Sequence, residues 1–291
     1  MIVVRLMGGL GNQMFQYACA KSLAIRFSTD VRVDLSYLLN EELRSQHSPR
    51  EFELGCFVLS QRSATPSDLA FFNCGKRGFA RLIQRLRPRV VLQERTLRYD
   101  PDLLAGAKKN TQLIGYWQSE AYFASIRGTL LSDFRLARPL SYRATEMAVN
   151  IRATIAVSLH VRRGDYAALP EVTSYHGLCG QTYYRKAIQY MRSKMPDARF
   201  FVFSDDPAWC RQNLEGIGGM TIVEPLDSAA EEMHLMSLCR HQIIANSSFS
   251  WWGAWLNTNP DKVVIAPKPW ISPTAPVQPD IIPPSWLVMH E

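Results

Sequence analysis

Five short apolar runs of strand-forming residues alternate with helical patterns along the second half of the chain, and this alternation constrains the fold more than any other feature. The runs occupy residues 155–161, 199–204, 220–224, 242–245 and 262–266. The helical patterns between them occupy residues 181–194, 207–214, 228–239 and 248–257. Parallel neighbouring strands need a crossover that returns the chain to the same edge of the sheet. The pattern therefore predicts a doubly wound α/β sheet with helices on both faces.

The first half opens with a unit of the same kind. A strand at residues 2–6 ends on Gly8, Gly9 and Gly11, a helical pattern runs to Phe27, and a second strand follows at residues 31–35. Further strands are expected at residues 90–93 and 112–115, further helices at 78–86 and 120–132, and a loop with short helices over 36–75. A chain of 291 residues exceeds what one core usually supports. We expect two domains, 1–140 and 141–291, with an extended Pro-rich tail at 267–291.

Composition excludes several classes of protein. With 47% hydrophobic and 20% charged residues the chain is an ordinary folded globule. No apolar run reaches the ~18 to 20 residues of a membrane span, and Arg5 interrupts the early apolar stretch, so we expect no signal peptide, no span and a cytoplasmic location. The six cysteines stand at scattered spacings, which favours reduced thiols over a disulfide framework or a metal site.

A net charge of +7, from 33 Lys and Arg against 26 Asp and Glu, favours anionic partners. Part of this charge gathers between residues 76 and 98, where a predicted surface helix carries several arginines. Nucleic acid, an anionic membrane surface and a phosphorylated ligand would all suit such a surface. No nucleic-acid recognition motif accompanies it, so we expect no nucleic-acid partner and weak peripheral contact with an anionic membrane, on its inner face.

Polar clusters follow three of the strands predicted in the second half. They comprise His160 at the end of the first strand with Arg162, Arg163 and Asp165 after it, Asp205 and Asp206 after the second, and Asn246, Ser247, Ser248 and Phe249 after the fourth. Ligands of a doubly wound sheet bind outside the carboxyl ends of its strands, so these clusters predict one binding rim.

Each cluster has a chemical use and a structural alternative. Adjacent arginines can bind a diphosphate through paired hydrogen bonds without a metal, or can be a solvated surface pair. Asn246, Ser247 and Ser248 can form an anion site at a helix N-terminus, or can cap a core helix whose apolar face is rich in tryptophan. Asp205 or Asp206 can accept hydrogen bonds from a base or a ribose, or can start a helix.

Two motifs in the first half are weaker. The loop from Gly8 to Gly11 lacks the G-x-G-x-x-G spacing of a dinucleotide site, although Asn12 and Gln13 after it offer amides to a ligand at an interdomain cleft. Asp100-Pro-Asp102 has the D-x-D form of metal-dependent sugar transferases, but its proline and the following leucines favour a helix cap. We expect no metal and no cofactor.

Four segments together resemble the bacterial α-1,2-fucosyltransferases of glycosyltransferase family 11. They are GGLGNQMFQY at 8–17, HVRRGDY at 160–166, FFVFSDD at 200–206 and LMSLCRHQIIANSSFSWWGAWLN at 235–257. The resemblance implies a GT-B-like fold, two Rossmann-like α/β domains facing across a cleft, with the acceptor on the N-terminal side. It also implies an inverting, metal-independent enzyme that transfers L-fucose from GDP-β-L-fucose to O2 of a terminal β-galactose of a glycan.

The resemblance also implies residue roles. Arg162 would bind the β-phosphate and carry most of the catalysis, and Arg163 would support it. His160 with Asp205 or Asp206 would bind guanosine, and Ser247, Ser248 and Phe249 would close on the diphosphate and base. Asn12 would reach the donor phosphate or the reacting sugar, and Asp165 would brace an arginine. Glu232 matches an acidic position that contacts guanine, although Met233 and His234 depart from the aromatic residue usual there.

Two other function classes remain to be weighed. A nucleotide-sugar binding module or inactive homologue would keep the donor pocket without transfer, and a nucleic-acid-binding protein would use the basic stretch. Binding of GDP, ADP and single-stranded DNA separates these classes, and an assay of transfer to lactose separates an enzyme from a binder.

Overall fold

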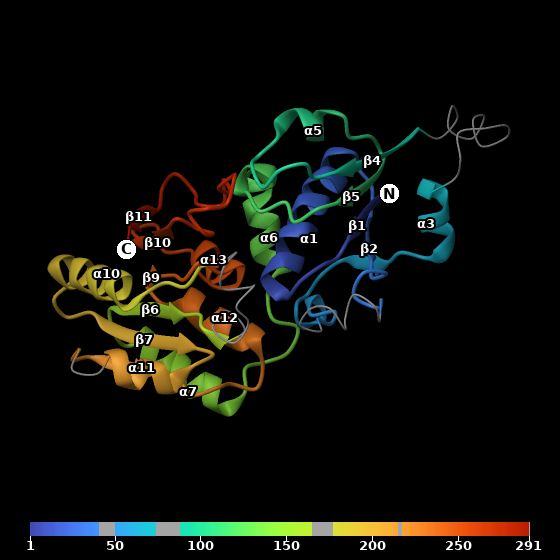
Figure 1. Ribbon diagram of the computed structural model, residues 1–291. Helices are drawn as coiled ribbons and strands as arrows, with labels where there is room; N and C mark the ends of the chain where they lie inside the picture. The colour runs from blue at the N-terminus through green and yellow to red at the C-terminus, as the bar shows by residue number, and fades with distance from the viewer. Residues whose placement is uncertain (41–49, 74–87, 165–176, 215–216, 291) are drawn as a thin grey trace. The chain divides into compact units, whose positions relative to one another are not determined.

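A computed structural model describes residues 1–40, 50–73, 88–164, 177–214 and 217–290 of the chain. The chain divides into two compact units, Met1–Ala137 with Pro279–Ile281, and Arg138–Gln278 with Ile282–Glu291. Each unit is built on a parallel β-sheet with helices packed against it (Figure 1). The expected α/β class is therefore confirmed in both halves.

The first unit contains a five-stranded sheet in the order β3-β2-β1-β5-β4, and every pair of neighbours is parallel. The strands are β1 (Ile2–Arg5), β2 (Val31–Asp34), β3 (Gln61–Ser63), β4 (Arg89–Gln93) and β5 (Asn110–Ile114). The central strand β1 is almost fully buried, as its β-branched sequence predicts. The short strand β3 lies within the segment expected to be loop, and its polar sequence gave no strand signal.

The described residues of the first unit include the helices α1 (Leu10–Arg26), α3 (Pro66–Asn73), α5 (Pro101–Ala105) and α6 (Arg127–Asp133), with short 3₁₀ turns at Leu54–Cys56, Glu120–Tyr122 and Ala124–Ile126. The prediction of a single helix over 120–132 is wrong for the first half of that range. Phe123 has an extended φ of −147° that ends the first 3₁₀ turn. Its ring packs on Phe15, and that of Tyr122 packs on Trp117, so aromatic burial overrides the helical pattern there. The helix expected at 78–86 lies outside the described residues.

The second unit contains a six-stranded parallel sheet in the order β11-β10-β9-β6-β7-β8. The strands are β6 (Ala156–Val161), β7 (Arg199–Ser204), β8 (Met220–Ile222), β9 (His241–Ile243), β10 (Val264–Lys268) and β11 (Leu287–His290). The first five match the predicted runs. The Pro-rich tail, expected to be extended, ends in the additional strand β11, which pairs with β10.

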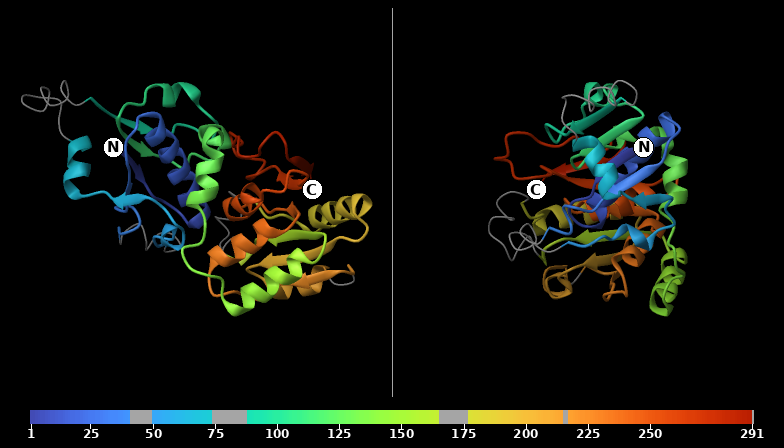
Figure 2. Two further views of the ribbon diagram at one scale, coloured as in Figure 1. Left: turned by 180° about the vertical axis from the view of Figure 1, so that it is seen from behind. Right: turned by 90° about the vertical axis from the view of Figure 1, so that its right-hand side faces the viewer.

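Helices cover both faces of this second sheet (Figure 2). Where the structure describes the chain, they are α7 (Tyr142–Arg152), α10 (Gln181–Lys194), α11 (Pro207–Leu214), α12 (Ala229–Leu238) and α13 (Ser248–Leu256). Because side chains alternate along a strand, Val157, Leu159 and Val161 of β6 pack with α10 and α11, whereas Phe201 and Phe203 of β7 pack with α7 and α12.

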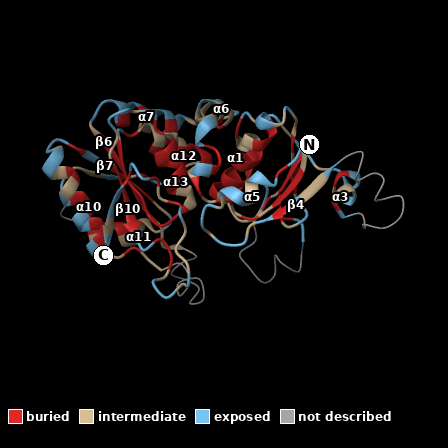
Figure 3. Ribbon diagram, turned by 90° about the horizontal axis from the view of Figure 1, so that it is seen from above, coloured by how far each residue is buried: buried red, intermediate tan, exposed pale blue. Residues whose placement is uncertain are grey.

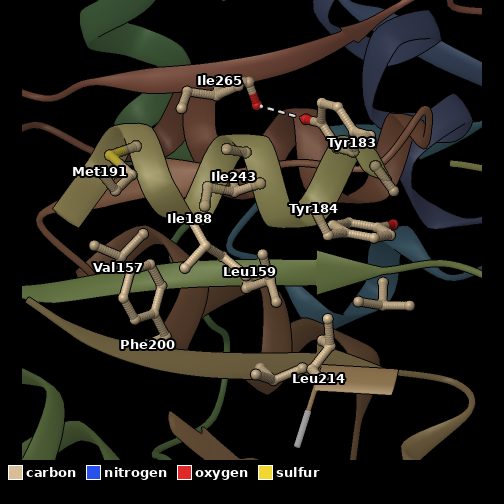
Figure 4. Close-up of a cluster of buried hydrophobic side chains, with 14 of the residues drawn as sticks. Val157, Leu159, Tyr183, Tyr184, Ile188, Met191, Phe200, Leu214, Ile243 and Ile265 are labelled. Atoms are coloured by element: carbon tan, nitrogen blue, oxygen red, sulfur yellow. Dashed lines mark hydrogen bonds between the residues drawn. The ribbon is translucent and has the colours of Figure 1, made fainter. Parts of the chain in front are cut away.

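The buried residues of each unit concentrate in the strands and in the helix faces that meet them (Figure 3). In the second unit, the Tyr183 hydroxyl of α10 donates to the backbone oxygens of Ile244 at 2.7 Å and Ile265 at 3.2 Å. Figure 4 shows the bond to Ile265. A buried polar group thus joins the helix to β10 and to the residue that follows β9. Among the described helices, none has the length and hydropathy needed to span a membrane.

Candidate functional site

The carboxyl ends of β6, β7 and β9 form one rim of the second sheet. Strands β7 and β9 flank β6, and residue pairs such as Val161 with Ser204 align their ends. The turn after β6 carries Arg162 and Arg163, and Asp205 follows β7. The segment after β9 leads into α13. The structure thus brings the predicted polar clusters together through neighbouring strands.

Asp205 organises the arginine turn. One of its carboxylate oxygens lies 2.9 Å from Nη1 of Arg162, and the other accepts the backbone N–H of Arg163 at 2.8 Å. A Cβ at Gly164 would stand 2.6 Å from the Asp205 carboxylate, so glycine permits this close approach. Asp205 therefore contacts three successive residues of the turn and fixes the position of the Arg162 guanidinium.

Arg163 is braced from the side. Its guanidinium lies over the ring of Trp209, 4.4 Å from the centroid, and its Nε is 3.6 Å from a carboxylate oxygen of Asp206. Asp206 also accepts the backbone N–H of Trp209 at 2.9 Å and so caps α11, which confirms the structural alternative weighed for this residue. Sequence reasoning missed Trp209, although an aromatic residue in the first turn after a strand-end carboxylate was a signal for it.

His160 is buried beneath the rim, with 5% of its surface exposed. Its ring lies 5.7 Å from that of Phe249, and its Nδ1 has no hydrogen-bond partner among the described residues. Burial, assisted by the positive charge of Arg162, lowers the pKa of His160 to about 3. The imidazole is therefore neutral at physiological pH, with one nitrogen still able to form a hydrogen bond.

The N-terminus of α13 completes the rim. The Ser247 hydroxyl accepts the backbone N–H of Phe249 at 3.3 Å and caps the helix, and Ser248 is half-buried at its first position. The Asn246 amide donates instead to the backbone oxygens of Trp270 at 3.2 Å and Gly177 at 3.4 Å. The capping alternative is confirmed for Ser247, and the structure shows Asn246 joining two loops.

Glu232 of α12 is the remaining acid of this region. It is half-buried, and one of its carboxylate oxygens accepts the backbone N–H of Leu226 at 3.5 Å. Burial raises its pKa above the usual value, and the nearby negative charge of Asp205 adds to this shift. The neighbouring Glu231 instead accepts both the backbone N–H and the hydroxyl of Ser141, so the two adjacent acids differ in their partners.

In the first unit, the amides after the glycine loop have unequal surroundings. Gln13 is fully buried, donates to the backbone oxygens of Gly8 at 2.9 Å and Glu51 at 2.7 Å, and accepts from the N–H of Glu53 at 3.0 Å. Gln13 therefore holds the loop and offers no amide to a ligand, contrary to expectation. Asn12 is partly exposed and accepts a hydrogen bond from Gln118 Nε2 at 2.8 Å.

The remaining predictions from the sequence concern Asp100, a metal site, Asp165 and the basic stretch. Asp100 accepts the N–H of Leu103 at 2.9 Å and caps α5, as the capping interpretation predicted. Among the described residues no group of three or more His, Cys, Asp and Glu is placed to hold a metal ion. Asp165 and most of the basic stretch, residues 76–87, lie outside the described residues. Of its remainder, Arg89 lies over the ring of Phe71.

Comparisons with known proteins give the site a family context. Residues 98–289 match the model described as "Glycosyl transferase family 11". The chain is 34% identical to an α-1,2-colitosyltransferase of Escherichia coli, covering 92% of each chain. It is 30% identical to the O-antigen biosynthesis glycosyltransferase WbnK of Escherichia coli, covering 92% of this chain and 94% of the relative. A galactoside 2-α-L-fucosyltransferase SEC1 of Bos taurus is 27% identical over 50% of this chain and 42% of its own.

A solved structure shares the fold. A mutant of Arabidopsis thaliana FUT1 in complex with GDP aligns with a TM-score of 0.50 and 12% sequence identity, covering 90% of this chain and 69% of its own. Together with the two parallel sheets, this likeness confirms the expected GT-B-type α/β fold.

Proposed function

Because this chain belongs to glycosyl transferase family 11 and is a glycosyltransferase, we propose that it transfers L-fucose from GDP-β-L-fucose to O2 of a terminal β-galactose with inversion at C1. The arginine turn held by Asp205 supports this proposal most directly. It gathers the guanidinium groups of Arg162 and Arg163 at the same sheet rim as the α13 N-terminus. Such a combination suits a diphosphate without a bound cation.

The proposed reaction depends on stabilising the leaving group. The acceptor O2 forms a bond to C1 of fucose as the C1–O bond to the β-phosphate breaks, and the hydroxyl proton is released. Negative charge then grows on the departing GDP while the sugar gains oxocarbenium character. Donors fixed before the reaction stabilise that charge more in the transition state than in the ground state. We assign this role first to Arg162, and to Ser247, Ser248 and the backbone at the N-terminus of α13.

Arg163 is proposed to support Arg162, because Trp209 and Asp206 hold its guanidinium. The neutral His160, together with Asp205, Glu232 and Phe249, is proposed to contact guanosine. Carboxylates of these acids can accept the N–H groups of a guanine edge or the hydroxyls of a ribose. Asn12 of the first unit is proposed as a further donor contact, and Asp165 as a brace for an arginine.

A second candidate donor follows from the 34% identity to an α-1,2-colitosyltransferase. Colitose is L-fucose without the 3-hydroxyl, so a site that binds one sugar needs little change to bind the other. A hydroxyl recognised by a buried polar group favours fucose strongly, whereas an apolar wall opposite C3 discriminates weakly. Comparing kcat/KM for the two GDP-linked sugars decides between these donors.

The test of the proposal combines binding with transfer. Wild-type protein is incubated with GDP-β-L-fucose and a panel of galactose-terminated acceptors, and NMR reads the linkage of each product. An α-linkage to O2 of galactose supports the proposal. Tight binding of GDP without transfer to any acceptor would make the protein a nucleotide-sugar binding module, and binding of single-stranded DNA in preference to GDP would favour the nucleic-acid alternative.

A further inference from the structure

The segment after β5 adopts an unusual conformation that a single carboxylate maintains. The two oxygens of Glu94 accept the backbone N–H groups of Tyr116 at 2.7 Å and Trp117 at 3.0 Å. Trp117 is fully buried and has a φ of +58°, a region that bulky residues rarely occupy. A Cβ at Gly115 would stand 2.4 Å from Cβ of Glu94, so only glycine fits beside this acid. Strained backbone of this kind persists where surrounding contacts determine it fully.

The next residue, Gln118, connects this segment to the residue that follows the glycine loop. Its Nε2 donates to Oδ1 of Asn12 at 2.8 Å, which joins the ends of β5 and β1, neighbours in the sheet of the first unit. Because an amide has its acceptor and donor on opposite sides, a hydrogen bond to Oδ1 fixes the direction of Nδ2. Within the described chain, Nδ2 of Asn12 has no hydrogen-bond acceptor.

Gly8 leaves space at this same amide nitrogen. It has a φ of +72°, and a Cβ there would stand 2.4 Å from Nδ2 of Asn12. Asn12 is partly exposed; Gln118 holds its amide oxygen, and its amide nitrogen lies beside the backbone of Gly8, which has no side chain. An N–H donor with a fixed direction and no internal acceptor is suited to an oxygen of a substrate.

We propose that Gln118 is a positioning residue that orients the Asn12 amide so that its Nδ2–H, and not its oxygen, faces a substrate oxygen. The inference rests on the proposed function, because it gives a direction to the donor contact proposed for Asn12. Gln118 acts through Asn12 and need not touch the substrate. Glu94 contributes indirectly, because it fixes the backbone that leads to Gln118.

Two substitutions of Gln118 separate orientation from packing. Gln118→Glu keeps the size of the side chain but removes its donor, so it attracts Nδ2 of Asn12 and turns the amide around. Gln118→Met also fills the space but leaves the amide free to rotate. We expect kcat to fall about tenfold or more for Glu and only a few-fold for Met, because hydrogen bonds to a charged group are the stronger ones. A purely structural role predicts a lower thermal midpoint for Glu, because a partly buried carboxylate loses solvation, whereas the positioning role predicts a larger loss of kcat for Glu at a nearly unchanged midpoint.

The matched control is Gln93→Glu, the same chemical change at an exposed residue at the end of β4. It should leave kcat, KM and the thermal midpoint near those of wild type. For both Gln118 variants, the affinity for GDP and the thermal midpoint should change little, so that the loss appears in kcat.

A double-mutant cycle completes the test. Once Asn12→Ala removes the amide, adding Gln118→Glu should lower kcat no further, because coupled residues are not additive. Additive losses, or a Gln118→Glu enzyme with wild-type kcat, would overturn the positioning role while the proposed function stands. Wild-type protein that transfers neither GDP-linked sugar would instead overturn the proposed function, and this role with it.

Discussion

Replacing Arg162 by alanine should separate catalysis from folding in this protein. The Arg162 guanidinium is paired with Asp205 at 2.9 Å, and both side chains are about one-quarter exposed. A partly exposed ion pair contributes at most ~1 kcal/mol to stability. With roughly 2–4 °C per kcal/mol for a chain of this size, the thermal midpoint should fall by no more than ~4 °C. The turn itself should survive, because Asp205 still accepts the N–H of Arg163.

The effect on turnover should be far larger. Loss of one preorganised donor to a developing negative charge costs ~10² or more in kcat. Arg162→Lys should rescue little, because an ammonium keeps the charge but lacks the planar pair of donors. Steady-state kinetics with GDP-fucose and lactose, beside a thermal melt of each variant, measures both effects.

Arg163→Ala is the internal comparison. It removes the contact with Trp209, worth ~1 kcal/mol, and an ion pair with Asp206 worth less than ~1 kcal/mol. The thermal midpoint should therefore fall by ~2–8 °C together with activity. Near-normal turnover in folded Arg162→Ala, with lost turnover in a stable Arg163→Ala, would show that the two roles are reversed. Near-normal turnover in both variants would refute the diphosphate site.

Three further predictions follow from the same rim. His160 has a pKa of about 3 in the folded protein against ~6.5 when unfolded. As the pH falls from ~6 to ~3 the unfolded state therefore binds the proton first, and stability should fall by up to roughly 1.4 kcal/mol per pH unit in that window. Urea denaturation of His160→Gln should show a flatter dependence, and equal slopes would contradict the burial argument. Gly164→Ala places a Cβ 2.6 Å from the Asp205 carboxylate and should lower kcat about tenfold or more, with GDP binding measured alongside. Saturating EDTA should leave initial rates unchanged, whereas a loss restored by Mn²⁺ would implicate Asp100 and Asp102.

The regular part of the second unit followed directly from local pattern. Runs of apolar strand residues separated by helical periodicity locate β6, β7, α10 and α11 within a residue of their bounds. Because all strands of a parallel sheet run in the same direction, polar residues at their carboxyl ends had to gather at one edge of the sheet. The strand β11 escaped detection because its pairing with β10 comes from the far end of a Pro-rich segment.

The sequence by itself determined the chemistry at the rim: two arginines, two acids and a serine-capped helix at the ends of particular strands. Only the tertiary structure decided which polar groups form hydrogen bonds within the protein and are therefore not available to a ligand. Gln13 and Asn12 are adjacent amides on one helix turn, yet one is buried in three backbone hydrogen bonds and the other is held by Gln118. Apart from Gly8, their partners lie 38 to 106 residues away in the chain, and no local pattern encodes a contact that forms only when distant segments pack.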